Sequence, residues 1–287
     1  MDLALLEDKL VEAITKAATT IPKPTFEALK KSKERENGVA EAQLDVILQN
    51  IKIGSKKRIP ICQDTGTPTF YVEAGSGFSN LKKVGPIIVR AVRRATKETP
   101  LRPNAVHPIT GKNSGDNTGK NIPYIEWQIA DSNELKIVYL PKSGGSENMS
   151  QLTMMPPAKG LDGVKEIVLD RVATMKGKPC PPTVVGIGLG GGSNIAMNLA
   201  KRALLRPVGV HHEERIISDL EVELKEKLNE LGVGPMGLGG KTTVLDVKIE
   251  YAHRHPASYP VGIVPQCWAN RRVPVFVSAD GSIEVGE

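Results

Sequence analysis

The chain has 287 residues, of which 40% are hydrophobic and 24% are charged, and its formal net charge is +6. This composition is that of a soluble globular protein that can bury a full core, as one large domain or as two lobes. No apolar run approaches the roughly 20 residues of a membrane-spanning helix, so we expect no membrane partner. Asp2, Glu7 and Asp8 near the start do not fit a signal peptide, so we expect a cytoplasmic protein.

Nucleic acid is not an expected partner either, although the chain is basic. Its positive residues are scattered, and only four Phe, two Trp and five Tyr are available to stack on bases. A modest positive excess also suits a small dianionic substrate.

The first half of the chain mixes helices and strands. Apolar residues at helical spacing predict helices over 2–16, 26–33, 39–53 and 86–96, the last with Pro86 in its first turn. Alternating residues predict strands over 69–72, 125–130 and 134–140, the last two joined through residues 131–133. Residues 102–123 are rich in Asn, Gly and Pro, which predicts a long loop of the kind that usually carries function.

The second half begins with a second long polar loop, expected over 141–157. Helices are predicted over 163–175, 194–205 and 216–231, with Gly232 just after the last one, where glycine is favoured. Strands are predicted over 183–188, 242–251 and 261–264, and a hairpin over 273–277 and 282–285. The predicted fold class is therefore α/β, with mixed β-sheets flanked by helices.

The three cysteines lie far apart in the sequence, in segments rich in proline, glycine or polar residues. Cys62 precedes Gln63 and Asp64, Cys180 precedes two prolines and a glycine run, and Cys267 precedes a tryptophan. If the fold brings them together, three thiolates suit an iron–sulfur cluster with one iron left open. Burial as three small hydrophobic residues is the alternative. The odd number argues against a purely disulfide role, and the lack of C-x-x-C pairs argues against zinc.

The glycine run from Gly186 to Gly192 follows a predicted strand and opens a predicted helix. It satisfies G-x-G-x-x-G, but no βαβ repeat is evident around it, so it is a weak nucleotide signal. An anion site at the helix start and close helix–strand packing are both open readings, and the nearness of Cys180 favours packing around a cluster. Gly240-Lys241-Thr242 is a second, partial phosphate-loop pattern.

The remaining candidate residues suit a carboxylate substrate. Arg102 could bind a carboxylate bidentately, and His255 and Asp64 could move protons near neutral pH. Each of them alone could equally be a surface charge or a satisfied loop residue. Their placement in cysteine-bearing or glycine-rich segments favours a joint role.

Together these segments resemble the class I, iron–sulfur-dependent fumarate hydratases. The resemblance is to the α subunit of the two-chain form, which corresponds to the N-terminal half of the single-chain form. It rests on Cys62-Gln63-Asp64-Thr65-Gly66, Gly144-Gly145-Ser146-Glu147-Asn148, Cys180-Pro181-Pro182 with its glycine run, and His255-Pro256-Ala257-Ser258 followed by Cys267-Trp268-Ala269. L-tartrate dehydratase α subunits share much of this pattern but depart from it in the Gly144 segment and around the third cysteine. The resemblance therefore favours fumarate.

The resemblance implies that residues 1–287 are a single catalytic α-subunit domain with the fold of the fumarase N-terminal domain. It implies a 4Fe–4S cluster held by Cys62, Cys180 and Cys267, whose fourth iron acts as a Lewis acid on the substrate in the reversible hydration of fumarate to L-malate.

The resemblance also implies the residues that handle the substrate. They are Gln63, Asp64, Arg102 and Gly145, the last through its backbone N–H, while His255 with Asp64 would relay a proton. The C-terminal domain of the family would come from a separate β subunit in an α2β2 assembly, so the chain alone is expected to be nearly inactive.

Three other functions stay open. One is dehydration of L-tartrate or a related hydroxy-dicarboxylate, or hydration of a methyl-substituted fumarate. Another is a non-catalytic cluster-binding, assembly or structural subunit, which would need the cysteines but neither Arg102 nor His255. A nucleotide-dependent enzyme built on the glycine run is the weakest alternative.

Overall fold

The structure is a computed structural model that describes residues 2–286. The chain divides into two compact units. Unit 1 comprises Met1–Pro22, Gln49–Ser143 and Arg271–Glu287, and unit 2 comprises Lys23–Leu48 and Gly144–Asn270. The chain therefore passes between the units four times, once within helix α3 (Gly38–Lys57). Within residues 2–286, no helix is both long enough and apolar enough to cross a membrane.

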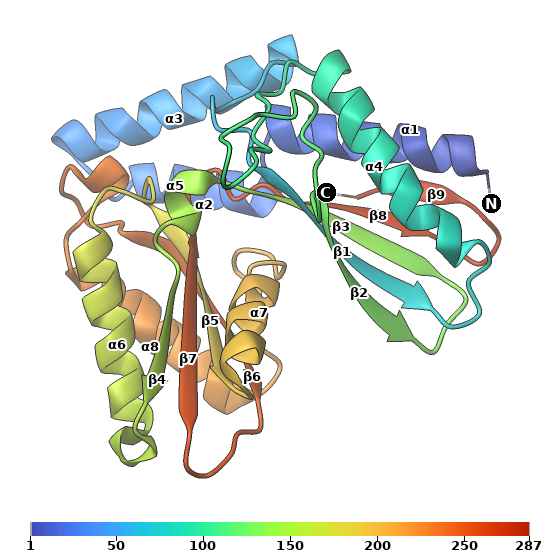
Figure 1. Ribbon diagram of the computed structural model, residues 1–287. Coiled ribbons are helices and arrows are strands. Elements are labelled where there is room, and N and C mark those ends of the chain that lie inside the picture. The colour runs from blue at the N-terminus through green and yellow to red at the C-terminus, as the bar shows by residue number, and fades with distance from the viewer. Residues whose placement is uncertain (1, 287) are drawn as a thin grey trace. The chain divides into compact units, whose positions relative to one another are not determined.

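Unit 1 is built on a five-stranded sheet with the order β2-β1-β3-β8-β9 (Figure 1). The strands are β1 (Thr67–Gly75), β2 (Tyr124–Ala130), β3 (Leu135–Lys142), β8 (Val273–Val277) and β9 (Ile283–Val285). β1 and β2 run parallel, and the other neighbouring pairs are antiparallel. The hairpin predicted at the end of the chain is confirmed as β8 and β9.

Helices α1 (Leu3–Thr19) and α4 (Leu81–Glu98) cover one face of this sheet. Side chains alternate between the two faces of a strand, so every second residue of β1, β3 and β8 contributes to the same core. The apolar stripes of both helices are buried in that core, together with Phe70, Val72, Ile137, Tyr139 and Val275. The predicted first helix is confirmed, and it begins after Asp2, whose Oδ1 caps the first turn.

The strands β2 and β3 follow one another in the chain but do not pair. Both pair with β1, which lies between them. Their connection passes the end of β1, where Gly75 N donates to Glu134 O at 2.8 Å and Gly77 N donates to Ser132 O at 3.1 Å. The alternating pattern of residues predicted both strands. Such a pattern does not indicate which other strand each of them pairs with.

Unit 2 contains a four-stranded sheet with the order β4-β7-β5-β6. The strands are β4 (Gln151–Met155), β5 (Thr183–Gly190), β6 (Val244–Ala252) and β7 (Tyr259–Gln266). Helices α6 (Gly160–Met175) and α8 (Arg215–Glu230) share one core with Val185, Ile187 and Leu189 of β5. Helix α7 (Ser193–Ala203) packs on the opposite face, which carries the alternate residues of β5. Unit 2 also includes α2 (Lys23–Lys33), the short α5 (Gly144–Glu147) and two 3₁₀ turns, Pro157–Lys159 and Pro235–Gly237.

The predicted α/β class with mixed sheets flanked by helices is confirmed, but three local predictions were wrong. The polar loop expected over 141–157 contains α5 and the edge strand β4, because five residues paired on one side are enough to form an edge strand. Pro86 lies in the sixth position of α4 and not in its first turn. β5 and β6 are parallel and joined through α7 and α8, so the glycine run does belong to a βαβ crossover.

Candidate active site

The Cys62 segment is a loop of unit 1 between α3 and β1. Its start is fixed at Ile61, whose carbonyl accepts Asn50 Nδ2 at 2.7 Å. Its end is shaped by Asp64, whose Oδ1 accepts the Gly66 N–H at 2.9 Å. Cys62 itself is half-buried and in no disulfide. The thiol therefore lies in a loop whose backbone is held on both sides.

The Arg102 segment packs against the Cys62 loop through the buried residue Asn117. Asn117 donates Nδ2 to Arg102 O at 3.2 Å, and its Oδ1 accepts the Asn104 N–H at 2.6 Å. Asn104 Nδ2 in turn donates to Thr65 Oγ1 at 3.3 Å and to Gly66 O at 3.2 Å. Unit 1 thus brings together two segments that the sequence singled out.

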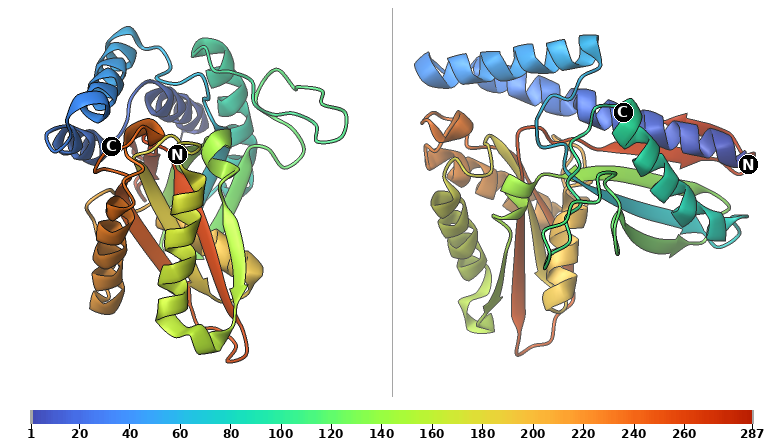
Figure 2. Two further views of the ribbon diagram at one scale, coloured as in Figure 1. Left: turned by 90° about the vertical axis from the view of Figure 1, so that its left-hand side faces the viewer. Right: turned by 45° about the horizontal axis from the view of Figure 1, so that its top comes forward.

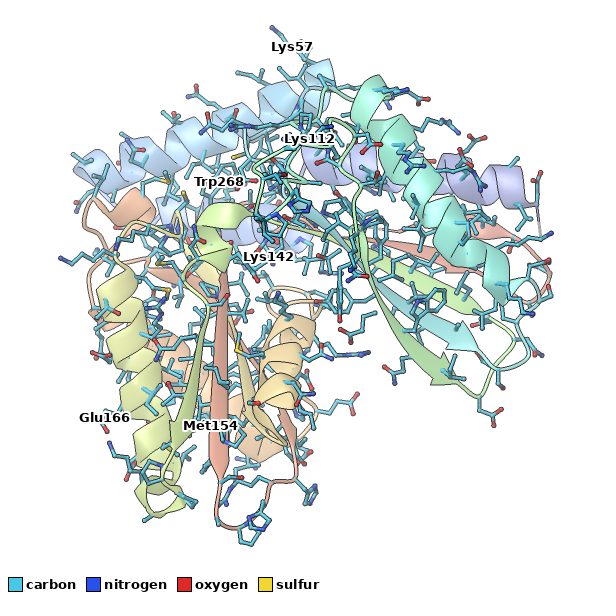
Figure 3. The ribbon with its side chains drawn as sticks, viewed as in Figure 1. Lys57, Lys112, Lys142, Met154, Glu166 and Trp268 are labelled. Atoms are coloured by element: carbon cyan, nitrogen blue, oxygen red, sulfur yellow. The ribbon has the colours of Figure 1, made fainter. Side chains whose placement is uncertain are left out.

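The Arg102 side chain is exposed and has no ion-pair or hydrogen-bond partner among residues 2–286. It lies at the start of the long loop between α4 and β2, whose irregular course is visible in Figure 2 and which also carries Lys112 (Figure 3). The long loop predicted over 102–123 is confirmed. A guanidinium without a protein partner can bind a carboxylate through two parallel hydrogen bonds.

The Cys180 and Cys267 segments meet in unit 2. Trp268 N donates to Cys180 O at 3.1 Å, and Cys180 N donates to Gly177 O at 3.0 Å. Cys180 is half-buried with a left-handed backbone (φ 57°), and Cys267 is 7% exposed. Both cysteines lie at the same end of the sheet. β5 begins and β7 ends there, because the two strands are antiparallel and Val184 pairs with Gln266.

Gly145 lies at the same end of unit 2. A Cβ placed on it would be 3.5 Å from Lys178 O, two residues before Cys180. Gly145 belongs to the first turn of α5, where backbone N–H groups have no acceptor inside the helix. Its N–H is therefore suited to an external acceptor. Glu147, on the same short helix, pairs with Lys201 Nζ at 2.7 Å.

His255 lies at the other end of the unit 2 sheet. It is exposed in the loop between β6 and β7, where its Nδ1 accepts the Ala257 N–H at 3.1 Å. The eight residues of β7 separate this loop from Cys267, a span of roughly 25 Å at the usual rise of a strand. Figure 1 shows the β6–β7 loop and α5 at opposite ends of the sheet. Within one copy of unit 2, the structure does not bring His255 to Cys180 and Cys267.

The glycine run is explained by packing. Added Cβ atoms at Gly186 and Gly188 would collide with the backbone carbonyls of Ala200 and Ala196 in α7. The run ends at Gly190–Gly192, beside the β6–β7 loop, so it is far from Cys180 in this sheet. The interpretation as packing around a cluster was therefore wrong, and close helix–strand packing accounts for the glycines.

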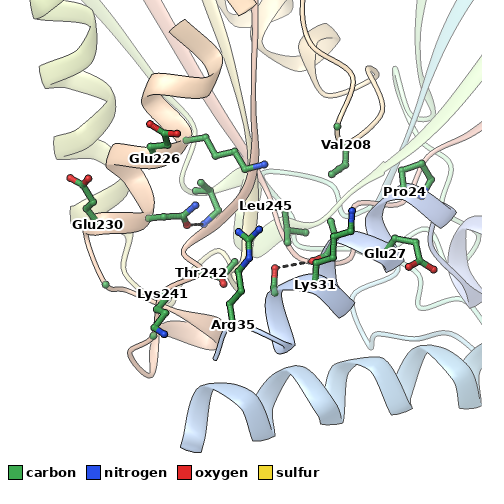
Figure 4. A pocket seen from close by; sticks show the side chains of 18 residues that line it. Pro24, Glu27, Lys31, Arg35, Val208, Glu226, Glu230, Lys241, Thr242 and Leu245 are labelled. Atoms are coloured by element: carbon green, nitrogen blue, oxygen red, sulfur yellow. Dashed lines mark hydrogen bonds between the residues drawn. The ribbon is translucent and has the colours of Figure 1, made fainter. Parts of the chain in front are cut away.

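The backbone N–H groups of the partial phosphate-loop pattern already donate to a carboxylate of the chain. Glu36 accepts the backbone N–H groups of Lys241 and Thr242 at 2.9 and 2.6 Å. Next to it, α2 and α8 line a pocket of about 890 Å³ in unit 2 (Figure 4). Its wall mixes cations such as Arg35 with acids such as Glu230, so its charge favours no one class of ligand.

Comparison with known proteins assigns a family. The sequence profile described as "Fumarate hydratase (Fumerase)" matches residues 7–275. The chain belongs to the fumarate hydratase family. Membership implies a hydro-lyase, an enzyme that adds water to a double bond or removes it, and confirms the resemblance inferred from the cysteine segments.

Three relatives of the chain carry two kinds of name, tartrate dehydratase and fumarate hydratase. The chain is 44% identical over 283 residues to "Putative L(+)-tartrate dehydratase subunit alpha" of Methanocaldococcus jannaschii, covering 97% of the chain and 99% of the relative. It is 35% identical over 269 residues to "L(+)-tartrate dehydratase subunit alpha" of Escherichia coli K12, covering 93% and 89%. It is 34% identical over 282 residues to "Putative fumarate hydratase class I" of Geobacillus stearothermophilus, of which it spans only 55%.

The candidate donors of this fumarate hydratase family member are three thiols, the usual ligands of iron–sulfur clusters. Among residues 2–286, no three His, Cys, Asp or Glu side chains form a group that could hold one metal ion. A cluster makes a different demand, because each thiolate binds a separate iron. All three cysteines are free of disulfides, and two of them lie in segments joined by a backbone hydrogen bond.

Two buried arginines of this family member were missed by the sequence reasoning. Arg271 is 0% exposed and Arg272 is 9% exposed, and neither has a carboxylate partner in the described chain. Burial lowers the pKa of Arg272 below its ordinary value. Burial also raises the pKa of Tyr139, an effect that the nearby charge of Arg271 opposes. The signal in the sequence was a pair of cations four and five residues after Cys267, at the entrance of a strand.

Proposed function

We propose that this chain is the α subunit of an iron–sulfur-dependent fumarate hydratase, which interconverts fumarate and L-malate. Residues 1–287 together form the catalytic α subunit, and Cys62, Cys180 and Cys267 hold a 4Fe–4S cluster. The observation that carries the proposal is the backbone bond from Trp268 to Cys180, which joins two of the three cysteine segments. When bound, the cluster supplies a Lewis-acidic iron that makes hydroxide a tolerable leaving group.

The residues of unit 1 bind and orient the substrate. The unpaired Arg102 guanidinium clamps one carboxylate, and its backbone is held to the Cys62 loop through Asn117 and Asn104. Gln63 is exposed in that loop, so its amide can donate to a substrate oxygen. Asp64 has one oxygen fixed by Gly66, which orients the carboxylate for a proton at the substrate hydroxyl. From unit 2, the Gly145 N–H donates to a carboxylate.

His255 has to reach the site from a second α chain. Its position at the far end of β7 keeps it from the cysteine segments of its own unit 2. An α2β2 assembly supplies a second α chain. In our proposal, His255 of that second chain forms a proton relay with Asp64 of the first. A separate β subunit would provide the remaining substrate-binding cations and the base for the carbon-bound proton. Reduced thiols favour the cytoplasm as the compartment.

L-tartrate is the second candidate substrate, and the names of two relatives favour it. Both candidates are hydroxy-dicarboxylates whose dehydration needs the same chemistry at the hydroxyl. The deciding measurement is kcat/KM for L-malate and for L(+)-tartrate, under identical anaerobic conditions and with the β chain present. A malate value at least tenfold higher supports fumarate hydration, and the reverse ratio assigns the chain to tartrate dehydration.

The test of the cofactor uses protein prepared without oxygen, alone and co-expressed with its β chain. We expect about four irons and four sulfides per α chain, with hydration only when the β chain is present. Cys62→Ala, Cys180→Ala and Cys267→Ala should each lose most of the iron. Full iron retention in these variants would show that the cysteines do not hold the iron. They would then be small hydrophobic residues, a role that alanine can also fill.

A further inference from the structure

Arg271 connects three segments that the proposed function uses. Its Nη2 donates to Asp64 O at 2.9 Å and to Ser143 Oγ at 3.0 Å, all within unit 1. Asp64 lies two residues after Cys62, and Ser143 lies two residues before Gly145. Arg271 itself follows Cys267 by four residues. One guanidinium nitrogen thus ties the Cys62 loop to the segment entering α5 and to the segment leaving the third cysteine.

The charge of Arg271 is not balanced within the chain. Its side chain is fully buried, and its Nε and Nη1 have no hydrogen-bond partner. No carboxylate of the described residues lies within ion-pair distance, and the adjacent Arg272 adds a second buried cation without a partner. Buried charges are normally paired, because an unpaired one is strongly destabilising. An unpaired buried cation therefore indicates that negative charge arrives with a ligand.

Resting on the proposed function, we propose that Arg271 is a positioning residue of the hydratase. It fixes the Asp64 backbone, and thereby the Cys62-Gln63-Asp64 loop, against Ser143 within unit 1. Its positive charge is balanced by the anionic site formed when three thiolates, the cluster and a dicarboxylate substrate are in place. The same charge stabilises added electrons nearby, so it raises the reduction potential of a cluster held by Cys62.

The alternative is a purely structural arginine that holds two loops together. Both roles predict that a small apolar replacement weakens the fold. Two other substitutions separate the roles. Arg271→Gln keeps a donor for Asp64 O and Ser143 Oγ but removes the charge. Arg271→Lys keeps the charge but loses the planar fork. Arg171→Gln is the control, since Arg171 likewise bonds to a distant backbone carbonyl, donating Nε and Nη2 to Met149 O.

The experiment compares wild type, R271Q, R271K and R171Q, each prepared as an anaerobic α–β complex. Three properties are measured: the iron content, the melting temperature with and without cluster, and the midpoint potential by redox-titrated electron paramagnetic resonance.

We expect R271Q without cluster to melt no lower than wild type, because an unpaired buried charge is removed. With cluster it should gain less stability, show a more negative midpoint potential and lose roughly 10- to 100-fold in kcat/KM, the usual cost of removing a group that supports a metal site. R271K should retain the potential, and R171Q should match wild type in potential and kcat/KM.

An R271Q complex that melts lower without cluster, yet shows an unchanged midpoint potential and kcat/KM, would overturn the inference and leave a structural arginine. A wild-type complex that binds no iron would instead overturn the proposed function. The two failures are distinguishable, because the first is read on variants of a cluster-loaded wild type.

Discussion

Trp268 donates its backbone N–H to the carbonyl of Cys180, and this 3.1 Å bond joins segments that are far apart in the sequence. The antiparallel pairing of β5 and β7 explains it, because Cys180 precedes the first strand and Cys267 follows the second. Two thiols are therefore placed at one end of a sheet by strand direction alone. Side-chain replacement of Trp268 leaves the bond possible, since the donor is a main-chain group.

Removing the N–H of Gly145 should weaken substrate binding without unfolding the chain. Gly145→Pro lacks that donor, and proline is tolerated in the first turn of a helix. We expect KM to rise about 10- to 100-fold, the equivalent of one hydrogen bond to a charged group. Steady-state hydration kinetics check this. Gly145→Ala is the control, because its Cβ meets only an ordinary contact at 3.5 Å, and an equal loss in both variants would contradict a role for the N–H.

Replacing Arg102 should affect catalysis and leave stability unchanged. Its guanidinium has no partner in the described chain, so Arg102→Gln removes no ion pair. We expect kcat/KM to fall at least roughly tenfold, with Arg102→Lys in between because lysine cannot bind a carboxylate bidentately. Urea denaturation should show no change. Arg215→Gln removes another exposed arginine, 93% exposed in its side chain, and should leave both measurements as in wild type.

Lys248→Met should destabilise the protein by about 3–5 kcal/mol, because it leaves the buried Asp246 carboxylate without its close partner. Lys248 Nζ lies 2.7 Å from Asp246 Oδ2, and both side chains are fully buried. Urea denaturation measures the loss. Lys225→Met is the control, since Lys225 is half exposed and 3.9 Å from the same carboxylate. Comparable losses in the two variants would contradict the buried pair as the cause.

The same pair sets a pH dependence of stability. Burial lowers the pKa of Lys248 below its ordinary value of 10.5, although Asp246 opposes the shift. The unfolded chain therefore binds this proton more tightly than the folded chain does. Stability should rise as pH increases from the folded pKa toward 10.5, and fall as pH drops through the folded pKa. Denaturation curves across alkaline pH should show this rise in wild type, and its persistence in Lys248→Met would argue against Lys248.

Gly188→Ala should unfold or strongly destabilise unit 2. The added methyl group would collide with the backbone carbonyl of Ala196, which cannot move without shifting α7, at a cost of at least about 1–3 kcal/mol. Gly192→Ala tests the same glycine run, where the added atom meets only the Asn194 side chain at 3.3 Å. A stable Gly188→Ala with altered ligand binding would revive a phosphate-binding role. Thermal melts of both variants check the difference.

Air should inactivate the proposed hydratase, because the proposed cluster has one iron without a protein ligand, and such an iron is open to oxidants. We expect loss of hydration activity together with loss of iron, and recovery of both on anaerobic incubation with ferrous iron and a thiol reductant. Parallel assays of iron content and turnover follow the two changes. Activity that survives prolonged aeration after the iron is gone would show that the reaction does not use the cluster.

Periodicity in the sequence predicted most helices and strands, because apolar spacing records which face of an element is buried. It could not predict that β1 separates β2 from β3, since pairing depends on where distant strands lie. It also missed β4, because the alternation of polar and apolar residues there runs over only five residues, with Leu152 and Met154 exposed on an edge strand.

The candidate site was predictable in part. Local chemistry marked the Cys62, Arg102 and Cys180 segments, and hydrogen bonds now join the first two of these through Asn104 and Asn117. His255 was grouped with the cysteines because it is close to Cys267 in sequence, whereas a whole strand separates them in space. Arg271 was overlooked because its burial comes from tertiary packing, which a charged residue beside a cysteine does not reveal.

The interleaving of the two units limits how the chain can be made and divided. Strands β8 and β9 of unit 1 are synthesised only after the whole of unit 2. Until they emerge from the ribosome, β3 is an open sheet edge able to pair with other chains. A nascent chain stopped before residue 271 thus holds a complete unit 2 beside an unfinished unit 1. Unit 1 is therefore the last of the two units to be completed, although two of its three segments are made before most of unit 2.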